Sequence, residues 1–166
     1  MYQVGSYVVY GIQGVCRVVG TETQRVNRVK TEYLVLEPLD KHEAKFFLPT
    51  GNPSALAKLK PVLTSEEATQ LLESAGDDGG CWIPEENRRK QRYRELTSSG
   101  DRWALMQMLS ALYRYRQVQL DEGRKFHQCD DNFLRDTERI LCLEIALVLN
   151  MSFEDARADL RQRLNG

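Results

Sequence analysis

Hydrophobic and polar positions in the first part of the chain recur with the short period of β-strands. Residues 31–37 are rich in β-branched and aromatic side chains, and Pro38 ends the run. Gly11 and Gly14 permit the positive φ angles of a short hairpin. We expect five strands, at residues 6–10, 15–22, 31–37, 43–48 and 58–63. Five short strands with tight turns predict a small β-barrel of the SH3 or Tudor type.

At Thr64 the hydrophobic period changes to that of amphipathic helices. Thr64 and Glu67 form a capping box ahead of apolar residues at helical spacing. Glycines and acids then predict a flexible loop. Asp101, Asp130 and Ser152 are expected to cap later helices. Five helices are expected. The first two span residues 65–75 and 84–97, the third begins after Asp101, the fourth begins after Asp130, and the last begins at Ser152 and ends near Leu164.

These patterns together predict an α+β protein with two domains. A Tudor-like, five-stranded barrel occupies residues 1–63, and an all-helical domain occupies residues 64–166, with a loop at residues 74–81. Hydrophobic residues make up 42% of the 166, which is enough for two packed cores. We find neither an apolar run of about 20 residues nor the residue order of a secretion signal. The sequence therefore predicts a cytoplasmic protein without membrane contact.

Catalytic and metal-binding motifs are missing from the sequence. It has no Gly-x-Ser-x-Gly, no phosphate-binding glycine loop with Lys and no His-Glu-x-x-His. His127 and Cys129 lie two residues apart, which is more typical of a turn than of a nucleophile with its base. The cysteines are too widely spaced for a metal site with His127 or His42: Cys16, Cys81, Cys129 and Cys142. We expect a non-enzyme with no cofactor, no metal and no small-molecule substrate.

Charge is unevenly distributed along the chain, although the net charge is only −1. Residues 64–87 contain seven acids and no Lys or Arg. Residues 88–125 contain ten bases and four acids, a local excess of six positive charges. A local field of this kind can attract nucleic acid even when the whole protein is nearly neutral.

Trp82 stands just before the basic segment and suggests a nucleic-acid surface. Basic side chains neutralise phosphates, and an aromatic ring beside them can insert at a base step or stack on an unpaired base. The candidate DNA-contacting residues are Trp82, Arg88, Arg89, Lys90 and Arg92, with a second basic group at Arg114, Arg116, Arg124 and Lys125. The alternative is a solvated helix face paired with nearby acids, with Trp82 packed as a lid over the helical core.

The expected strand at residues 43–48 is the second candidate surface. It is short, apolar at Phe46 and Phe47, and bounded by prolines, so it is a candidate edge for a partner strand. The alternative is that the side chains of both phenylalanines fill the barrel. Because neighbouring residues of a strand point to opposite faces, we expect one of the two rings to point outward.

The order of these motifs resembles the CarD/CdnL family of bacterial transcription regulators. The chain opens with Y-Q-V-G-S-Y-V-V-Y-G, followed by Gly14 and Val15, which is similar to the family's opening. Further matching segments follow in order at residues 33–36, 48–49, 88–89, 99–101, 112–114, 138–141 and 144–147. Together these segments cover almost the whole length of the chain.

The resemblance implies a Tudor-like domain that binds the β subunit of RNA polymerase, as in the transcription-repair coupling factor. It implies polymerase contacts at Arg25, Lys45, Phe46, Phe47 and Leu48. It also implies a helical domain on promoter DNA near the upstream edge of the melted bubble. There Trp82 would wedge into the minor groove, with Arg88, Arg89 and Arg92 as phosphate contacts.

We therefore expect a transcription regulator that stabilises the open promoter complex. A protein–protein adaptor of the transcription machinery without direct DNA contact is the alternative. A small RNA-binding Tudor-like module is a third possibility, and it predicts RNA affinity without polymerase.

Overall fold

The computed structural model describes residues 2–41 and 43–166, so His42 lies outside the described residues. The chain forms two compact units that divide between Val62 and Leu63. We call them the sheet unit and the helical unit. No helix in the part of the chain that the structure describes is long and apolar enough to cross a membrane.

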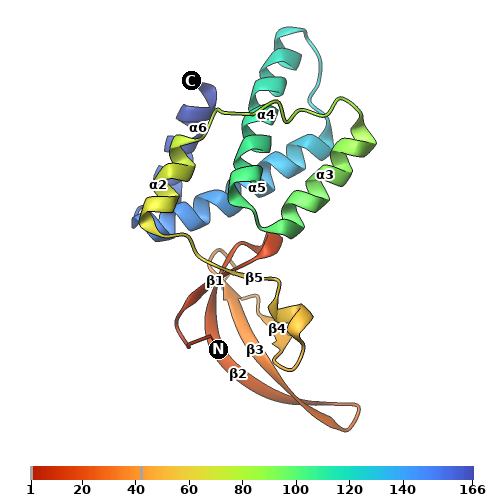
Figure 1. Ribbon diagram of the computed structural model, residues 1–166, viewed down its shortest axis with the longest axis vertical. Helices are drawn as coiled ribbons and strands as arrows, with labels where there is room; N and C mark the ends of the chain where they lie inside the picture. The colour runs from red at the N-terminus through yellow and green to blue at the C-terminus, as the bar shows by residue number, and fades with distance from the viewer. Residues whose placement is uncertain (1, 42) are drawn as a thin grey trace. The chain divides into compact units, whose positions relative to one another are not determined.

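The sheet unit contains five antiparallel strands in the order β4-β3-β2-β1-β5 (Figure 1). Their bounds are β1 Tyr7–Tyr10, β2 Val15–Val26, β3 Val29–Pro38, β4 Phe46–Pro49 and β5 Leu59–Pro61. All five expected strands are present, and the α+β fold class is confirmed. A 3-10 turn, η1 Gly11–Gln13, joins β1 to β2, and one short helix, α1 Pro53–Leu56, was not predicted.

β2 and β3 form a hairpin that is longer than the sequence indicated. Its turn is Asn27–Arg28, and both residues have positive φ (51° and 67°), as a two-residue turn of type I′ requires. The turn was missed because its usual marker is a glycine after the asparagine. The two strands pair from Cys16–Pro38 to Val26–Val29, with one irregularity between Val18 and Gly20.

The strand order defines the two edges of the predicted five-stranded unit. β4 and β5 lie at the two ends of the order, and no pairing joins them among residues 2–41 and 43–166. β4 has four residues and β5 has three. Pro49 and Pro61 also lack the N–H that a further ladder would need. The sheet is therefore open, with β4 as one edge and β5 as the other.

The core of the sheet unit comes from alternate positions of the paired strands. Buried side chains from all five strands pack together. β1 to β4 contribute Val8, Cys16, Val18, Leu34, Leu36 and Leu48, and β5 contributes Leu59. Tyr10 and Phe46 pack against this cluster from its border, with their rings edge to face. This core fixes β4 against β3 and so determines which side of β4 remains open.

The helical unit contains five helices (Figure 1). They are α2 Ser65–Glu73, α3 Glu86–Ser99, α4 Arg102–Asp121, α5 Gln128–Leu149 and α6 Phe153–Asn165. The Thr64 capping box and the caps at Asp101 and Ser152 are present. The prediction that Asp130 caps a helix is wrong: α5 starts at Gln128, and Asp130 lies fully buried in its first turn.

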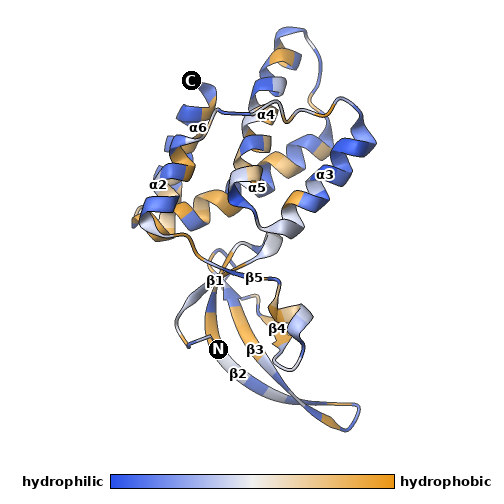
Figure 2. Ribbon diagram, in the orientation of Figure 1, coloured by the Kyte–Doolittle hydropathy of each residue, from blue (hydrophilic) through white to orange (hydrophobic). Residues whose placement is uncertain are grey.

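α4 and α5 supply most of the core of the helical unit. Figure 2 shows apolar residues concentrated on these helices, whereas α3 is mainly hydrophilic. α3 contributes only Tyr93 and Leu96 as buried apolar side chains. The remainder of α3 is therefore free to carry charge, which makes this helix the natural place to look for a binding surface.

Candidate nucleic-acid interface

Trp82 is half-buried. It belongs to the segment before α3, and this segment passes over α4 (Figure 1). Its ring stacks on Tyr115 of α4, with 3.7 Å between ring centroids and 24° between planes. The Arg89 guanidinium lies 4.5 Å from the centre of the Trp82 ring. Because Tyr115 fills one face of the indole, Arg89 occupies the other. Both faces are covered, so stacking on a DNA base would require displacing one of them, whereas the exposed edge of the ring needs no such change.

Arg89 is part of the folded core rather than of a DNA-contacting surface. Only 3% of it is exposed, and it donates to both carboxylate oxygens of Asp130 at 2.8 and 2.9 Å. Its remaining nitrogen donates to the carbonyls of Ile83 and Pro84 at 3.1 and 3.2 Å. The prediction that Arg89 contacts phosphate is therefore corrected, because its donors are already used inside the protein. These same bonds hold the segment that carries Trp82.

The pKa values around this pair follow from burial and hydrogen bonding. Burial alone lowers the pKa of the Arg89 guanidinium, but the hydrogen bonds and charge of Asp130 outweigh it, and the net pKa is raised. Burial raises the pKa of the Tyr93 hydroxyl, and its 2.6 Å hydrogen bond to Asp130 raises it further. Arg89 therefore stays charged and Tyr93 stays neutral across the physiological range.

The other cations of α3 lie in two separate stripes. Arg88 and Arg92 are one helical turn apart, and together with Ile83, Gln91 and Glu95 they line a shallow hollow of about 240 Å³. Arg92 also lies close enough to Cys81 to affect its thiol. Burial and the charge of Asp78 raise the pKa of Cys81, and the charge of Arg92 lowers it in part. Arg88 and Arg92 therefore lie beside the segment that carries Trp82.

Lys90 lies on the other side of α3, because two residues turn a helix by about 200°. Its ammonium is 3.5 Å from Glu86, which also accepts a hydrogen bond from Cys129 of α5. The structure thus places Arg88 and Arg92 together and separates Lys90 from them. Arg92 has an exposed partner, Glu95, at 3.4 Å, whereas Arg88 has no ion pair among the residues described.

The second basic group is also divided. Arg114 is 2.7 Å from Asp78 and donates to the Gly76 carbonyl, so it fastens the loop between α2 and α3. Arg116 lies 4.8 Å above the ring of Tyr113, in a groove between α4, α5 and α6. Two residues that alternate along one helix therefore serve different sites.

Arg124 and Lys125 lie in the connection between α4 and α5, next to the stack that supports Trp82. The Arg124 N–H donates to the Gln119 carbonyl at 2.8 Å, and the Gln119 side chain donates to the Tyr115 hydroxyl at 3.0 Å. Both cations are exposed, and the ion pair that Arg124 makes within residues 2–41 and 43–166 is an exposed one with Glu122 at 3.5 Å. We group these two cations with Arg88, Arg92 and the edge of Trp82 as candidate DNA-contacting residues, and we call the set the indole surface.

Sequence reasoning missed the residues that hold Trp82 in place. Asp130 had the pattern of a helix cap, and Tyr115 was considered only as a ring alternating with arginines. Gln119 is buried, and within the described residues its side-chain oxygen has no hydrogen-bond partner. The sequence marks the Arg89–Asp130 pair only weakly. It shows an arginine near the start of one predicted helix and an acid near the start of another.

The predicted polymerase surface is the edge strand β4. Phe46 packs against the core and Phe47 is 41% exposed, so the expectation that one ring points outward is confirmed. Phe47 lies edge to face with Tyr33 of β3, at 6.3 Å between ring centroids. Lys45, just before the strand, is exposed. The open edge, Phe47 and Lys45 together form a surface suited to a partner strand.

Two of the residues implied for polymerase contact lie elsewhere. The Leu48 side chain is buried in the sheet core and pairs with Leu34, so any contact it makes is through its backbone. Arg25 pairs with Lys30 near the hairpin turn, three residues beyond the last β3–β4 pair at Tyr33. At about 3.3 Å per residue this places Arg25 about 10 Å farther along the sheet.

Comparison with known families gives a match for the sheet unit. Residues 2–60 match the family of CarD-like/TRCF RID domains. Over these residues the sheet unit is similar to a RID domain. The resemblance to the CarD family is thereby confirmed for this part of the chain, and the helical unit lies outside the match. No curated protein matches the chain.

RID domains are non-catalytic and bind the β subunit of RNA polymerase. The match over residues 2–60 therefore supports a transcription-related role for the chain. The RID match covers no part of the helical unit and says nothing of DNA.

Proposed function

We propose that the chain is a non-enzymatic transcription regulator that stabilises the open promoter complex. The RID domain binds the β subunit through the edge of β4, and the helical unit contacts promoter DNA through the indole surface. We place this activity in the bacterial cytoplasm, where the polymerase is found. The observation that carries the proposal is the arrangement of Arg88 and Arg92 beside a rigidly held indole in a chain that also has a polymerase-binding domain.

The energetics need only a weak DNA contact. Binding to polymerase raises the local concentration of the helical unit near the promoter, so a surface that binds free DNA poorly is sufficient. If that surface binds the melted promoter better than the closed duplex, the population shifts toward the open form. A preference of about 1.4 kcal/mol changes the ratio tenfold.

The proposed role of Trp82 is that of a pre-positioned wedge. Tyr115 and Arg89 fix the ring on both faces, so little side-chain freedom is lost when its edge meets a base step. Arg88 and Arg92 supply phosphate contacts on one side of the indole, and Arg124 and Lys125 supply them on the other. This set replaces the predicted one, from which Arg89, Lys90, Arg114 and Arg116 are removed.

Measuring the lifetime of open promoter complexes with polymerase and the full chain tests the wedge. Trp82→Ala is expected to shorten the lifetime while polymerase binding stays unchanged. Trp103→Ala is the matched control, because Trp103 is an exposed tryptophan of the same unit outside the indole surface. Equal lifetimes for Trp82→Ala and the parent would refute the wedge.

Salt dependence tests the phosphate contacts. Each lost contact reduces the slope of log K against log salt by about 0.9. Arg88→Ala with Arg92→Ala is therefore expected to reduce the slope of promoter binding by about 1.8. Arg163→Ala, which removes an α6 cation paired with Asp159, is the control that should leave the slope unchanged.

An adaptor without DNA contact is the second candidate function. The exposed ion pairs of Lys90 with Glu86 and of Arg92 with Glu95 favour it, because they reduce the positive field of α3. This function predicts polymerase binding by the full chain with no salt-dependent promoter contact at all.

A further inference from the structure

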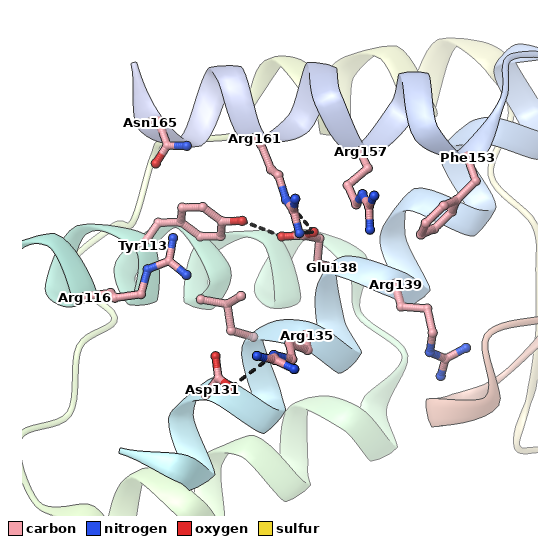
Figure 3. Close-up of a pocket in the computed structure, with 11 residues that line it drawn as sticks. Tyr113, Arg116, Asp131, Arg135, Glu138, Arg139, Phe153, Arg157, Arg161 and Asn165 are labelled. Carbon is pink, nitrogen blue, oxygen red and sulfur yellow. Dashed lines mark hydrogen bonds and ion pairs between the residues drawn. The ribbon is translucent and has the colours of Figure 1, made fainter. Parts of the chain in front are cut away.

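Many cations of the helical unit have partners inside the protein. In the groove between α4, α5 and α6, the buried Glu138 carboxylate accepts hydrogen bonds from Tyr113 and from Arg161 (Figure 3). In the same groove Asp131 is 3.0 Å from Arg135. These pairs balance charge inside the protein, in contrast to the cations at the end of the β2–β3 hairpin.

The end of the β2–β3 hairpin is a two-stranded ribbon, with no third strand of the described residues paired to it. β1 pairs with β2 only as far as Arg17, and β4 pairs with β3 only as far as Tyr33. β2 and β3 continue to pair as far as Val26 and Val29. Figure 1 shows the hairpin reaching beyond the other strands of the unit. We call residues 24–31 the ribbon.

The ribbon contains three cations and no acid. Arg25 and Lys30 are cross-strand partners, and Arg28 lies in the turn. All three are exposed, and within the part of the chain that the structure describes their side chains have no ion pair or hydrogen bond. Glu32, the nearest acid on β3, accepts a hydrogen bond from the Thr50 hydroxyl at 3.0 Å. The ribbon therefore presents positive charge that is open to a partner.

Arg28 occupies a backbone position that favours glycine. Its φ is 67°, and it forms the two-residue turn with Asn27, whose φ is 51°. Glycine is the favoured second residue of such a turn, because a side chain at positive φ is strained. Strain of this kind is typical of residues that hold a ligand. An arginine at this position therefore points to a binding role for its charge.

The ribbon also exposes two apolar side chains. Val26 and Val29 are the last pair before the turn, and they are 46% and 61% exposed. Because neighbouring residues of a strand point to opposite faces, the valines lie on the face of the ribbon opposite to Arg25 and Lys30. One face is therefore cationic and the other apolar.

We propose that the ribbon binds duplex DNA through its phosphates. The major groove, about 12 Å wide, admits a two-stranded ribbon and has phosphates along both rims. The three cations contact these phosphates, and the two valines lie against sugars and thymine methyl groups. Phosphate contacts carry no sequence information, so the ribbon holds duplexes of unrelated sequence. This inference goes beyond the proposed function, because it gives the sheet unit a DNA contact that shares no residue with the indole surface.

An acidic protein surface is the competing partner, because the family resemblance implies a polymerase contact for Arg25. Two observations favour DNA. The cations come from both strands and from the turn, which suits the two rows of phosphates along a groove. They also begin about 10 Å beyond the β4 edge that a partner strand would use.

Titration of a labelled DNA duplex with the full chain tests the ribbon, with fluorescence anisotropy measured at several salt concentrations. Arg25→Gln with Arg28→Gly and Lys30→Gln removes the three cations, and glycine suits the turn. At low salt this variant is expected to bind at least tenfold more weakly than the parent. The slope of log K against log salt should fall by about 2.7, at about 0.9 for each phosphate contact. Two duplexes of unrelated sequence should give the same reduction.

Two further variants serve as controls. Lys41→Gln with Lys58→Gln and Arg94→Gln removes the same charge from exposed positions, so it should leave the slope unchanged. Arg25→Lys with Arg28→Lys preserves the charge of the ribbon, so it should keep the slope of the parent.

Several outcomes would overturn the proposal. They are no binding of the duplex by the parent at low salt, or an equal loss of slope in either control. An unchanged slope in the ribbon variant, together with weaker binding to the polymerase β subunit, would identify an acidic protein surface as the partner instead.

The proposed function is tested separately, because Arg88→Ala with Arg92→Ala leaves the ribbon intact. A reduced slope in the ribbon variant alone would support the ribbon and refute the indole surface. A reduced slope in the Arg88 and Arg92 variant alone would refute the ribbon and support the indole surface.

Discussion

Arg89 and Asp130 lie 41 residues apart in the sequence and form a bidentate ion pair that is almost fully buried. The pair joins the first turn of α3 to the first turn of α5 directly beneath Trp82. Its position explains how a loop rich in glycine and acids ends in a fixed tryptophan. The carbonyls of Ile83 and Pro84 are held by the same guanidinium, so the loop is anchored where it enters α3.

Asp130→Asn is expected to destabilise the helical unit by about 3–5 kcal/mol, because it leaves a buried guanidinium without its counter-charge. Urea denaturation monitored by circular dichroism measures the change. Glu95→Gln, which removes an exposed partner of Arg92, should change the stability by less than about 1 kcal/mol. Similar losses in both variants would mean that burial of the pair has no energetic consequence.

Tyr115→Ala is expected to shift the fluorescence emission of Trp82 to longer wavelength, because one face of the indole becomes open to water. The measurement uses a Trp103→Phe background, in which Trp82 is the sole tryptophan. Tyr7→Ala, the same substitution at an exposed position of the sheet unit, is the control. An unchanged emission maximum after Tyr115→Ala would contradict the stacked arrangement.

Substitutions of Phe46 and of Phe47 are expected to have different effects, the first on the stability of the sheet unit and the second on polymerase binding. Phe46→Ala should destabilise the sheet unit by about 2–4 kcal/mol, because the ring packs against the core. Phe47→Ala should change stability by less than about 1 kcal/mol and weaken binding to the polymerase β subunit. Thermal unfolding and a binding titration on both variants decide the matter, and a stable Phe46→Ala protein would refute the core assignment.

Cysteine reactivity should follow burial. Burial raises the pKa of Cys142 to about 12, and Cys16 is also buried, so neither should react with a thiol reagent in the folded protein. Burial also raises the pKa of Cys81 and of Cys129, so their thiolate forms are scarce at pH 7. We expect these two to react slowly and faster as pH rises from 7 to 9. Protein unfolded in urea provides the control, because all four thiols should then react. Fast labelling of Cys142 at pH 7 would contradict its burial.

Much of the fold was predictable because the signals were local. Strand-forming residues, the Thr64 capping box and the caps at Asp101 and Ser152 act within a few residues, so they are visible in the sequence. The alternation of side chains along a strand was sufficient to predict that Phe46 and Phe47 point in different directions. The order of the strands depends on pairing between distant segments, so no local pattern specified it.

The sequence by itself determined the elements, the concentration of basic residues after Trp82 and the resemblance of the opening strands to a polymerase-binding domain. Only the tertiary structure decided which of the cations face solvent. Arg88 and Arg89 are neighbours, yet one is exposed and the other is buried on a carboxylate from another helix. The physical reason is that a charge is buried only where a distant partner compensates it, and no local pattern records where Asp130 lies in space.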